Sequence, residues 1–382
     1  MKEGWEYIDF KDFFPIKMGK TPPRGDKSSW DEKKETHNKW VSIADISNNE
    51  GKIIEDTKEY ISDSAAEKIN KVSKGSLLMS FKLSIGRMAF AGDDLYTNEA
   101  IIAIPENDKY ILRFIYYYLL SYDWLSLTEG NEKVKGATLN KTSIGKIQLP
   151  VLSLIGQQTI VDYLDSAFAK IDAMKANAEK ALNEAKALFQ ASLKEMLEPK
   201  EGWEEKKFGD VCWYNKNNGL HKGTRYVGME HIEQGTGNLL GTISSDDVLS
   251  NTFAFKKGDV LYGRLRPYLK KVIVADFEGC CSTEIFPIQS KSIIGPFLMY
   301  WFLTDETTNK VNATCAGCRM PRGNMNDVLK FNISYPPLSE QQSIVTTLDS
   351  LKSKVDRLQE NCDKISQECD ALKQAILRQV FE

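Results

Sequence analysis

The fold of this chain is decided by the stretch Leu338-Ser339-Glu340-Gln341-Gln342-Ser343-Ile344-Val345-Thr346-Thr347-Leu348-Asp349, together with an earlier copy of it. The earlier copy reads Leu152-Ser153-Leu154-Ile155-Gly156-Gln157-Gln158-Thr159-Ile160-Val161-Asp162-Tyr163-Leu164-Asp165. Both contain Gln-Gln, Ile-Val and Leu-Asp at the same relative spacing. Each then continues into a long helical pattern.

Apolar residues follow both copies in alternating steps of four and three, which is the heptad signature of a coiled-coil seam. In the second helix the predicted seam includes Ile344, Leu348, Leu351, Val355, Leu358, Ile365, Leu372 and Ile376. In the first helix it includes Ile160, Leu164, Ile171 and Leu188, with alanines between them. Small residues facing large ones let helices approach closely, so we expect the two helices to pair. The alternative is two amphipathic helices that pack separately on globular cores.

The rest of the chain repeats as well. Gly4-Trp5-Glu6 returns as Gly202-Trp203-Glu204, Asn98-Glu99 as Thr283-Glu284, and Tyr116-Tyr117-Tyr118-Leu119 as Tyr300-Trp301-Phe302-Leu303. A period this long indicates duplication of a domain plus a helix rather than a solenoid. We therefore predict an α+β fold in which two pseudo-repeated α/β domains are joined by two long antiparallel coiled-coil helices. The predicted segments are domain 1–150, helix 151–199, domain 200–336 and helix 337–382.

Connectivity predicts how these parts are arranged. The second domain begins where the first helix ends, and the termini of compact domains usually lie close together. The helices should then be antiparallel, with one domain at each end of a rod and a pseudo-twofold axis across its middle. Phe189, Leu193 and Met196, near the end of the first helix, would suit either a partner interface or the surface of the adjoining domain.

Composition narrows the class of protein. The chain has 382 residues and a net charge of −3, with acidic charge concentrated on the two helices and a slight positive excess on the domains. The start of the chain has no apolar signal-peptide core, and the apolar runs are too short to span a bilayer. We expect a cytoplasmic protein with no membrane segment and with reduced cysteines.

Cys315 and Cys318 have the spacing of half a zinc site, but no second pair completes it, so no metal site is predicted.

Polar, cationic loops at matching places in the two domains are the candidate DNA contacts, because Arg and Lys bind phosphates and Arg also bonds guanine edges. The alternative for each is a solvated surface charge. In the first domain the candidates are Lys20, Thr21, Arg24, Lys82, Ser84, Arg87, Lys135 and Lys141. In the second they are Arg264, Arg266, Lys270, Arg319, Arg322 and Asn324.

Catalytic motifs are missing from the sequence. Gly19-Lys20-Thr21 is not a nucleotide-binding loop, because Phe14 stands where that motif needs glycine and Pro22-Pro23 obstructs the following helix. No Gly-rich cofactor loop and no Asn-Pro-Pro-Tyr type of methyltransferase motif occurs; Tyr335-Pro336-Pro337-Leu338 differs from it. We predict a non-catalytic chain without a cofactor of its own.

The chain resembles the DNA-specificity subunit of Type I restriction-modification enzymes over its whole length. The resemblance rests on two variable domains, two similar long helices, and the motif Pro336-Pro337-Leu338-Ser339-Glu340-Gln341-Gln342. The first copy departs from the motif by two extra residues and lacks the Glu.

The resemblance implies that each domain is a target-recognition domain reading one half of a bipartite site in double-stranded DNA. It implies that the helices set the spacer and dock two methyltransferase subunits, which carry S-adenosylmethionine, and that ATP-dependent restriction subunits join them. A competing hypothesis is a coiled-coil scaffold whose end domains bind protein or glycan.

Overall fold

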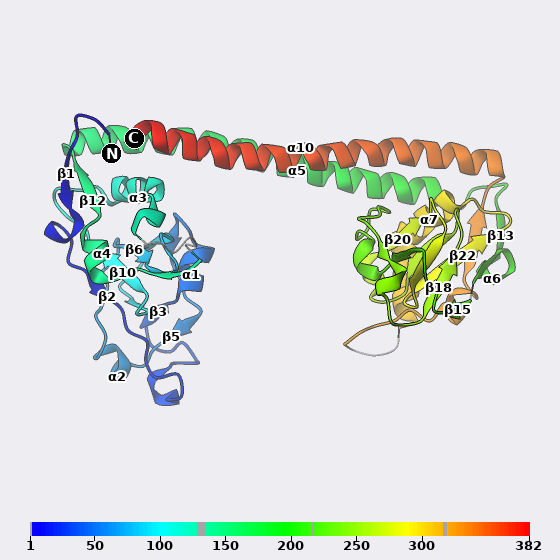
Figure 1. The fold of residues 1–382 in the computed structure, drawn as a ribbon, viewed down its shortest axis with the longest axis horizontal. Coiled ribbons are helices and arrows are strands. Elements are labelled where there is room, and N and C mark those ends of the chain that lie inside the picture. The colour runs from blue at the N-terminus through cyan, green and yellow to red at the C-terminus, as the bar shows by residue number, and fades with distance from the viewer. Residues whose placement is uncertain (1, 128–134, 216, 316–318) are drawn as a thin grey trace. The chain divides into compact units, whose positions relative to one another are not determined.

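The computed structural model describes residues 2–127, 135–215, 217–315 and 319–382. It divides into two compact units. Unit 1 comprises Met1–Ala176 and Lys364–Glu382, and unit 2 comprises Asn177–Asp363. Each unit therefore joins one globular domain to about half of each long helix, α5 (Leu154–Leu197) and α10 (Leu338–Phe381) (Figure 1).

The domain of unit 1 is built on a five-stranded sheet of order β2-β10-β6-β8-β4 and a three-stranded sheet of order β5-β3-β9. Two further pairs, β1-β12 and β11-β7, complete it. In chain order the elements are β1 (Glu6–Asp9), β2 (Lys17–Met18), β3 (Lys39–Val41), α1 (Ile43–Asn48), β4 (Ile53–Ile54), β5 (Glu59–Tyr60), α2 (Asp63–Ala66), β6 (Leu77–Ser80), β7 (Lys82–Ser84), β8 (Met88–Ala91), β9 (Tyr96–Thr97), β10 (Ile101–Ile104), α3 (Leu112–Ser121), β11 (Lys135–Thr138), α4 (Lys141–Gly145) and β12 (Gln148–Val151).

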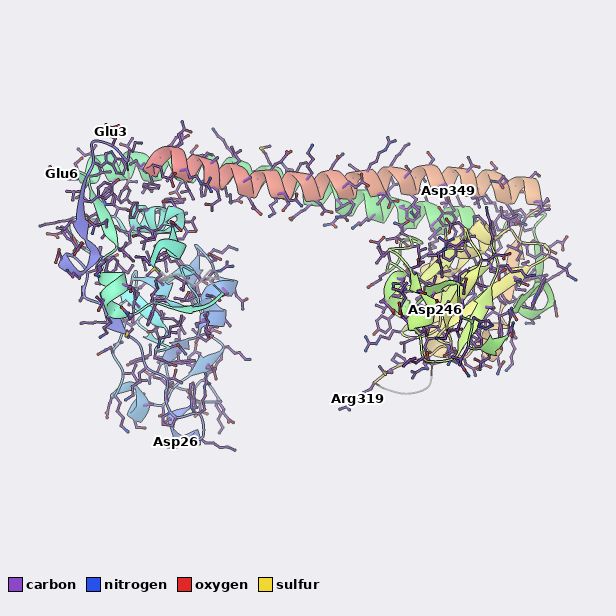
Figure 2. All side chains as sticks on the ribbon, in the orientation of Figure 1. Glu3, Glu6, Asp26, Asp246, Arg319 and Asp349 are labelled. Atoms are coloured by element: carbon purple, nitrogen blue, oxygen red, sulfur yellow. The ribbon has the colours of Figure 1, made fainter. Side chains whose placement is uncertain are left out.

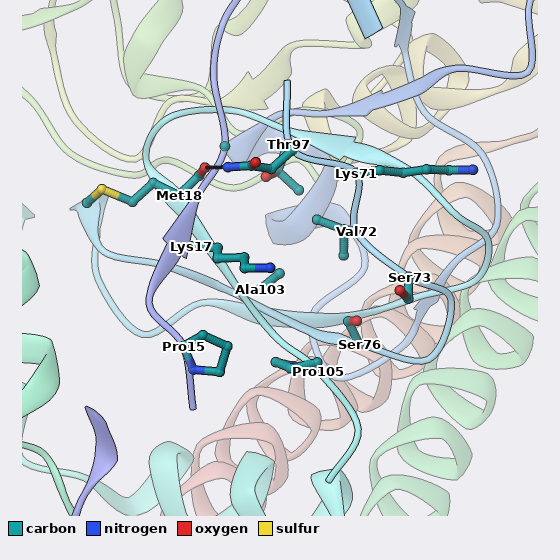
Figure 3. A pocket seen from close by; sticks show the side chains of 12 residues that line it. Pro15, Lys17, Met18, Lys71, Val72, Ser73, Ser76, Thr97, Ala103 and Pro105 are labelled. Atoms are coloured by element: carbon teal, nitrogen blue, oxygen red, sulfur yellow. Dashed lines mark hydrogen bonds between the residues drawn. The ribbon is translucent and has the colours of Figure 1, made fainter. Parts of the chain in front are cut away.

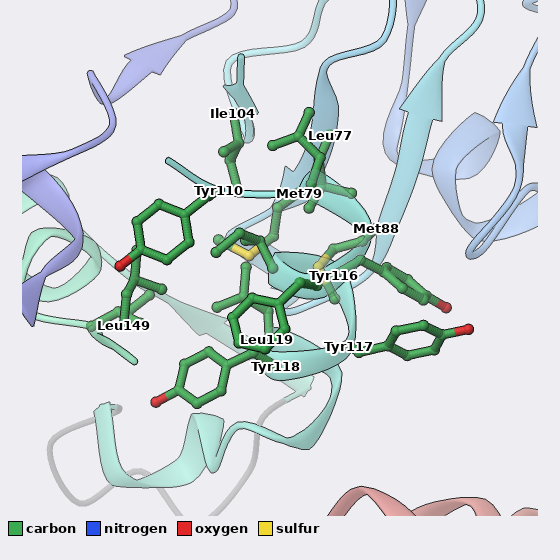
Figure 4. Packing of buried hydrophobic residues seen from close by; sticks show 14 of the residues in the cluster. Leu77, Met79, Met88, Ile104, Tyr110, Tyr116, Tyr117, Tyr118, Leu119 and Leu149 are labelled. Carbon is green, nitrogen blue, oxygen red and sulfur yellow. The ribbon is translucent and has the colours of Figure 1, made fainter. Parts of the chain in front are cut away.

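The main core of unit 1 forms around α3, which packs between the sheet and the long helices (Figures 1 and 4). Leu119 is fully buried, and Tyr117 and Tyr118 point to different sides of α3 (Figure 4). The ring of Tyr117 lies edge-on to Phe168 of α5, with centroids 5.4 Å apart. The aromatic run of α3 is thus core, and it attaches the domain to the long helix.

Unit 2 repeats this plan with a four-stranded sheet of order β14-β22-β19-β20 and a five-stranded sheet of order β15-β18-β21-β16-β17. A pair β13-β23 corresponds to β1-β12 of unit 1. In chain order the elements are β13 (Glu204–Lys207), α6 (Phe208–Val211), β14 (Cys212–Tyr214), β15 (Asn218–Gly219), β16 (Arg225–Val227), β17 (Ile243–Ser244), β18 (Thr252–Phe255), β19 (Val260–Gly263), β20 (Val272–Val274), β21 (Gly279–Ser282), β22 (Ile285–Ser290), α7 (Gly295–Leu303), α8 (Asp305–Ala313), α9 (Met325–Val328) and β23 (Asn332–Tyr335).

The first glutamine of the repeated Gln-Gln pair explains part of the motif. Gln157 is fully buried, and its Oε1 accepts the backbone N–H of Ile111, just before α3, at 2.8 Å. Its Nε2 donates to the carbonyls of Lys109 at 2.8 Å and Leu152 at 2.9 Å. A buried amide bonded three times fixes the first turn of α5 against the start of α3.

Gln341 makes the same three kinds of contact in unit 2. It is fully buried, accepts from the N–H of Ile294, just before α7, at 2.9 Å, and donates to the carbonyls of Ser292 at 2.9 Å and Pro336 at 2.8 Å. The two junctions between domain and helix are therefore equivalent, although the sequence motif is imperfect in the first copy.

The repeated Leu-Asp pair forms a second anchor. Leu348 is fully buried, and Asp349 accepts a hydrogen bond from the Tyr300 hydroxyl at 2.6 Å. Burial and this bond raise the pKa of Tyr300 well above its ordinary value, so the hydroxyl stays a donor. In unit 1 the Tyr117 hydroxyl donates to Asp165. Tyr117 is therefore the counterpart of Tyr300, and the sequence alignment that paired Tyr116 with Tyr300 is wrong by one residue.

The long helices pair in antiparallel directions within each unit. In unit 1, Lys373 pairs with Asp172, and Lys175 pairs with Asp370 at 3.7 Å. In unit 2, Lys186 donates to Gln359 at 2.7 Å. In unit 1 the residue numbers of the contacting pairs rise along α5 and fall along α10. This confirms the predicted antiparallel direction. Among the described residues, no helix combines the length and the apolar composition needed to cross a membrane.

The predicted seam is only partly correct. Leu164, Ile171, Ile344 and Leu348 are buried, and five predicted members are partly buried against the cores. These five are Ile160, Leu351, Val355, Ile365 and Ile376.

Three predicted seam residues are exposed instead: Leu188 by 63%, Leu358 by 38% and Leu372 by 47%. On α5 the buried stripe runs one residue further along, through Val161, Phe168, Leu182 and Phe189. The helix is turned so that these side chains are removed from water together with Leu164 and Ile171 of the predicted stripe. Leu193 is 1% exposed and belongs with Phe189 to the core of unit 2. The C-terminal end of α5 therefore packs on the globular domain of unit 2.

Candidate nucleic-acid interface

Two of the cationic segments of unit 1, those that begin at Lys82 and at Lys135, lie side by side. Strand β7, which contains Lys82 and Ser84, pairs antiparallel with β11, in the register Lys135 to Ser84 and Thr138 to Lys82. Between them Leu83 adopts a left-handed backbone with φ of 63° and is 61% exposed. Segments some fifty residues apart in the sequence thus form one surface.

The candidate side chains on this surface differ in how they are held. Lys82 lies with Nζ 5.5 Å from the Phe81 ring centroid. Arg87 is exposed and forms an ion pair with Glu50. Lys141 is exposed at the first position of α4. The side chain of Lys135 lies outside the described residues.

The loop at residues 19–27 is tied into the domain. The Lys20 carbonyl accepts from the Trp40 indole at 3.1 Å, while the Lys20 side chain is exposed. Thr21 donates to Glu99 and accepts from Asn98 at 3.2 Å. A nearby pocket of about 100 Å³ is lined by Lys17, Met18 and Lys71 among others, and by none of the predicted DNA contacts (Figure 3).

Arg24, in the same loop, is held by contacts within unit 1. Both of its Nη groups bond to Glu59, one of them at 3.1 Å. Its guanidinium also stacks over the rings of Trp30 and Trp40, 4.2 and 4.9 Å from their centroids. With its Nη groups occupied by Glu59, Arg24 stabilises the loop.

Unit 2 brings the equivalent two loops together. Leu265 and Arg322 form an antiparallel bridge. The N–H of Arg266 donates to the Pro321 carbonyl at 2.7 Å, and that of Gly323 donates to the Arg264 carbonyl at 2.9 Å. The cationic turn after β19 and the loop before α9 are therefore one surface, as their counterparts are in unit 1.

Glu284 lies between two of the predicted arginines. Its Oε2 accepts from Arg264 Nε at 3.0 Å and its Oε1 accepts from Arg322 Nε at 2.8 Å. The side chain of Glu284 is 22% exposed, against 33% for Arg264 and 42% for Arg322. Glu284 is not among the DNA contacts that the sequence predicts, although its recurrence opposite Glu99 in the repeat is a signal for it.

The remaining candidates of unit 2 fall into two groups. Lys270 donates to the Leu303 carbonyl at 3.0 Å and pairs with Asp305, and the Asn324 side chain caps α9. Both are occupied by internal contacts. Arg266 and Arg319 are exposed and have no hydrogen-bond or ion-pair partner for their side chains among the described residues; Arg319 points away from the body of its unit (Figure 2).

Arg264 borders an open hollow of about 380 Å³. Aromatic rings and amides line it together with Arg264, whose guanidinium carbon lies 5.4 Å from the centroid of the Phe286 ring. The lining residues are Tyr214, Asn218, Phe253, Arg264, Phe286, Asn324, Met325 and Asn326. Within the described ranges, no cluster of His, Cys, Asp and Glu could hold a metal ion, and Cys318 lies outside those ranges.

Known proteins share this organisation. The family model of the Type I restriction modification DNA specificity domain matches the chain twice, over residues 2–184 and 200–367. The specificity subunit of the Type I restriction enzyme EcoDI from Escherichia coli is 27% identical over 304 residues, which are 69% of this chain and 68% of that protein.

Two solved structures have the same fold. One is a chain from a study of complex assembly and conformational transition of the type I R-M system, with a TM-score of 0.75 and 18% identity, covering 100% of this chain and 98% of that one. The other is the HsdS subunit from Thermoanaerobacter tengcongensis, with a TM-score of 0.55 and 16% identity, covering 100% and 97%. They confirm the predicted fold class, and the two matches of the family model show that this chain belongs to the Type I restriction modification DNA specificity family.

Proposed function

We propose that this chain is the specificity subunit of a Type I restriction-modification complex and that each unit reads one half of a split target in double-stranded DNA. The observation that carries the proposal is the equal construction of the two units. In each, two cationic loops from distant parts of the domain meet, while a buried glutamine and an aspartate–tyrosine bond attach the domain to the long helices.

The two halves of the target should differ in sequence. Unit 2 presents an Arg–Glu–Arg cluster, whereas at the matching place in unit 1 Glu99 accepts from the Thr21 hydroxyl. Base edges are read by the identity and placement of such donors, so unlike sets favour unlike bases. An asymmetric bipartite site follows from this difference.

The helices are proposed to set the spacer between the two halves. Helices α5 and α10 are each continuous over 44 residues, and each contributes to both units. Because the anchors fix each domain to the first turns of a long helix, the length of the helices would determine how many unread base pairs separate the halves.

Exposed apolar residues on the helices supply a docking surface for methyltransferase subunits. In unit 1, Met174 is 58% exposed, and the ion pairs on either side place it level with Leu372. In unit 2, the Lys186–Gln359 bond places Leu188 level with Leu358. One such patch in each unit fits two methyltransferase subunits. These would supply S-adenosylmethionine and the adenine chemistry, and ATP-dependent restriction subunits would join them, while this chain would contribute no catalytic group.

The test is adenine-methylation sequencing of cells that carry the cognate methyltransferase with and without this chain. The proposal predicts a split motif with two unlike halves that appears only when the chain is present. A folded, active complex that gives no chain-dependent motif would refute DNA reading and favour a scaffold whose domains bind protein or glycan. In the purified complex, DNA affinity should also fall steeply with salt, as phosphate contacts require.

A further inference from the structure

The two arginines held by Glu284 use their Nε groups for that contact and leave most of their Nη donors without a partner among the described residues. Each gives its Nε–H to one oxygen of the carboxylate, at 3.0 Å for Arg264 and 2.8 Å for Arg322. The Nη groups of Arg264 have no hydrogen-bond partner among the described residues, and those of Arg322 make one long contact, to the Met320 carbonyl at 3.5 Å. The two Nη donors at the end of a guanidinium form a planar fork, and here the fork remains available while its stem is fixed.

Charge and exposure suit an external partner. Two guanidinium groups share one carboxylate, so the cluster keeps an excess positive charge. The arginine side chains are 33% and 42% exposed, while that of Glu284 is only 22% exposed. Arg264 also borders the 380 Å³ hollow, where the ring of Phe286 limits its movement. The side chains are thus partly exposed to solvent, while Glu284 holds their Nε groups.

We infer, on the basis of the proposed function, that Glu284 positions Arg264 and Arg322 to read guanine in the half-site of unit 2. Guanine presents O6 and N7 on one major-groove edge, and these two acceptors match the end of an arginine fork. Preorganisation by a carboxylate reduces the rotamer entropy lost when the base is bound. Glu284 positions the two arginines, and the arginines are the residues that contact guanine.

Other arginines on the same surface serve a different purpose. Arg266 and Arg319 are exposed, and no carboxylate among the described residues holds them. Unrestrained cationic side chains suit phosphates, which supply affinity without sequence information. Substitution of Arg266 and Arg319 should weaken DNA binding at every sequence and leave the methylated motif unchanged.

The experiment compares methylation motifs in cells carrying the methyltransferase with the wild-type chain, Arg264→Lys, Arg322→Lys or Glu284→Gln. Lysine retains the charge and lacks the fork. Each lysine variant should lose about tenfold or more of the preference for one G·C pair in one half of the motif, with the other half unchanged. Glu284→Gln should relax the same positions. Arg225→Lys is the matched control, because Arg225 lies in β16, outside the two loops that meet at Leu265 and Arg322. Its guanidinium carbon lies 3.6 Å from the centroid of the Phe277 ring.

The outcomes separate the inference from the proposed function. If the wild-type chain directs no split motif, the proposed function itself fails. If it directs one with no G·C pair in the half assigned to unit 2, or if the lysine variants leave every position unchanged, only the guanine inference is overturned. A purely structural cluster would lower methylation equally at all sites without altering the motif, which also overturns it. If the Glu284→Gln protein does not accumulate in cells, the Arg264→Lys and Arg322→Lys variants still test whether the two arginines read guanine.

Discussion

At the residue scale, the junctions between domain and helix depend on single buried polar side chains. Gln341→Ala would leave the N–H of Ile294 and the carbonyls of Ser292 and Pro336 without their buried partner. Unsatisfied buried groups cost about 1–3 kcal/mol each, so we expect local destabilisation of about 3 kcal/mol. Hydrogen exchange of the full chain should show faster exchange at the start of α7, by about a hundredfold.

The next residue supplies the control for this prediction. Gln342 belongs to the same motif, but its side chain is exposed, so Gln342→Ala should change exchange at α7 by less than about 0.5 kcal/mol. Equal effects of the two substitutions would show that the motif acts through helix propensity rather than through the buried amide.

The sequence predicts these junctions only in part. The repeat of Gln-Gln and Leu-Asp identifies the positions, but nothing in the repeat says that the first glutamine is buried and the second exposed. The sequence also does not identify the partner of Asp165, because three consecutive tyrosines make the alignment of α3 with α7 ambiguous by one residue. Only the contact of Tyr117 with Asp165 resolves it.

At the element scale, the long helices carry two neighbouring apolar stripes, and heptad spacing alone does not say which is buried. Leu188, Leu358 and Leu372 fit a regular seam yet are exposed. The choice is made by tertiary contacts that the helix pattern does not contain: Phe168 packs on Tyr117, and Phe189 packs on Tyr300 at 6.3 Å between centroids. The sequence likewise predicts the loops of unit 1 only as separate candidates for DNA contact. Pairing between strands β7 and β11 brings two of them together in the fold.

The exposed stripe leads to a prediction about partners. The double substitution Leu188→Glu and Leu358→Glu places charge on the docking surface proposed for unit 2, where neither side chain is part of the core. Folding should be little changed, because the substituted residues already face solvent. Association with the methyltransferase should weaken by about tenfold or more, as measured by titration of the purified subunits, because each charge must be desolvated at the interface.

Substitution of exposed, uncharged polar residues on the same helices is the control. Asn183→Glu and Ser353→Glu add the same single negative charge per site to exposed positions of α5 and α10 in unit 2, outside the apolar stripe. If these weaken association as much as the leucine substitutions do, general electrostatics rather than the apolar surface governs docking.

At the scale of the whole molecule, the proposed spacer role can be tested by changing helix length. Insertion of one heptad at matching levels of α5 and α10 preserves the faces of both helices and adds about 10 Å to each. The unread spacer should lengthen by about three base pairs, at about 3.4 Å per pair, with both half-sites retained. Methylation sequencing would report the change directly, and an unchanged spacer would exclude the helices as its determinant.

The measurement that tests the central claim most directly is methylation sequencing after exchange of one recognition domain. Residues 200–336 would be replaced by the corresponding domain of another member of the family, leaving unit 1's domain and both helices as they are. Because each domain is fixed to the helices by its own anchors, one half of the motif should change while the other half and the spacer stay the same. A change in both halves, or an exchange that leaves the motif as it was, would contradict the account that each domain reads its half independently.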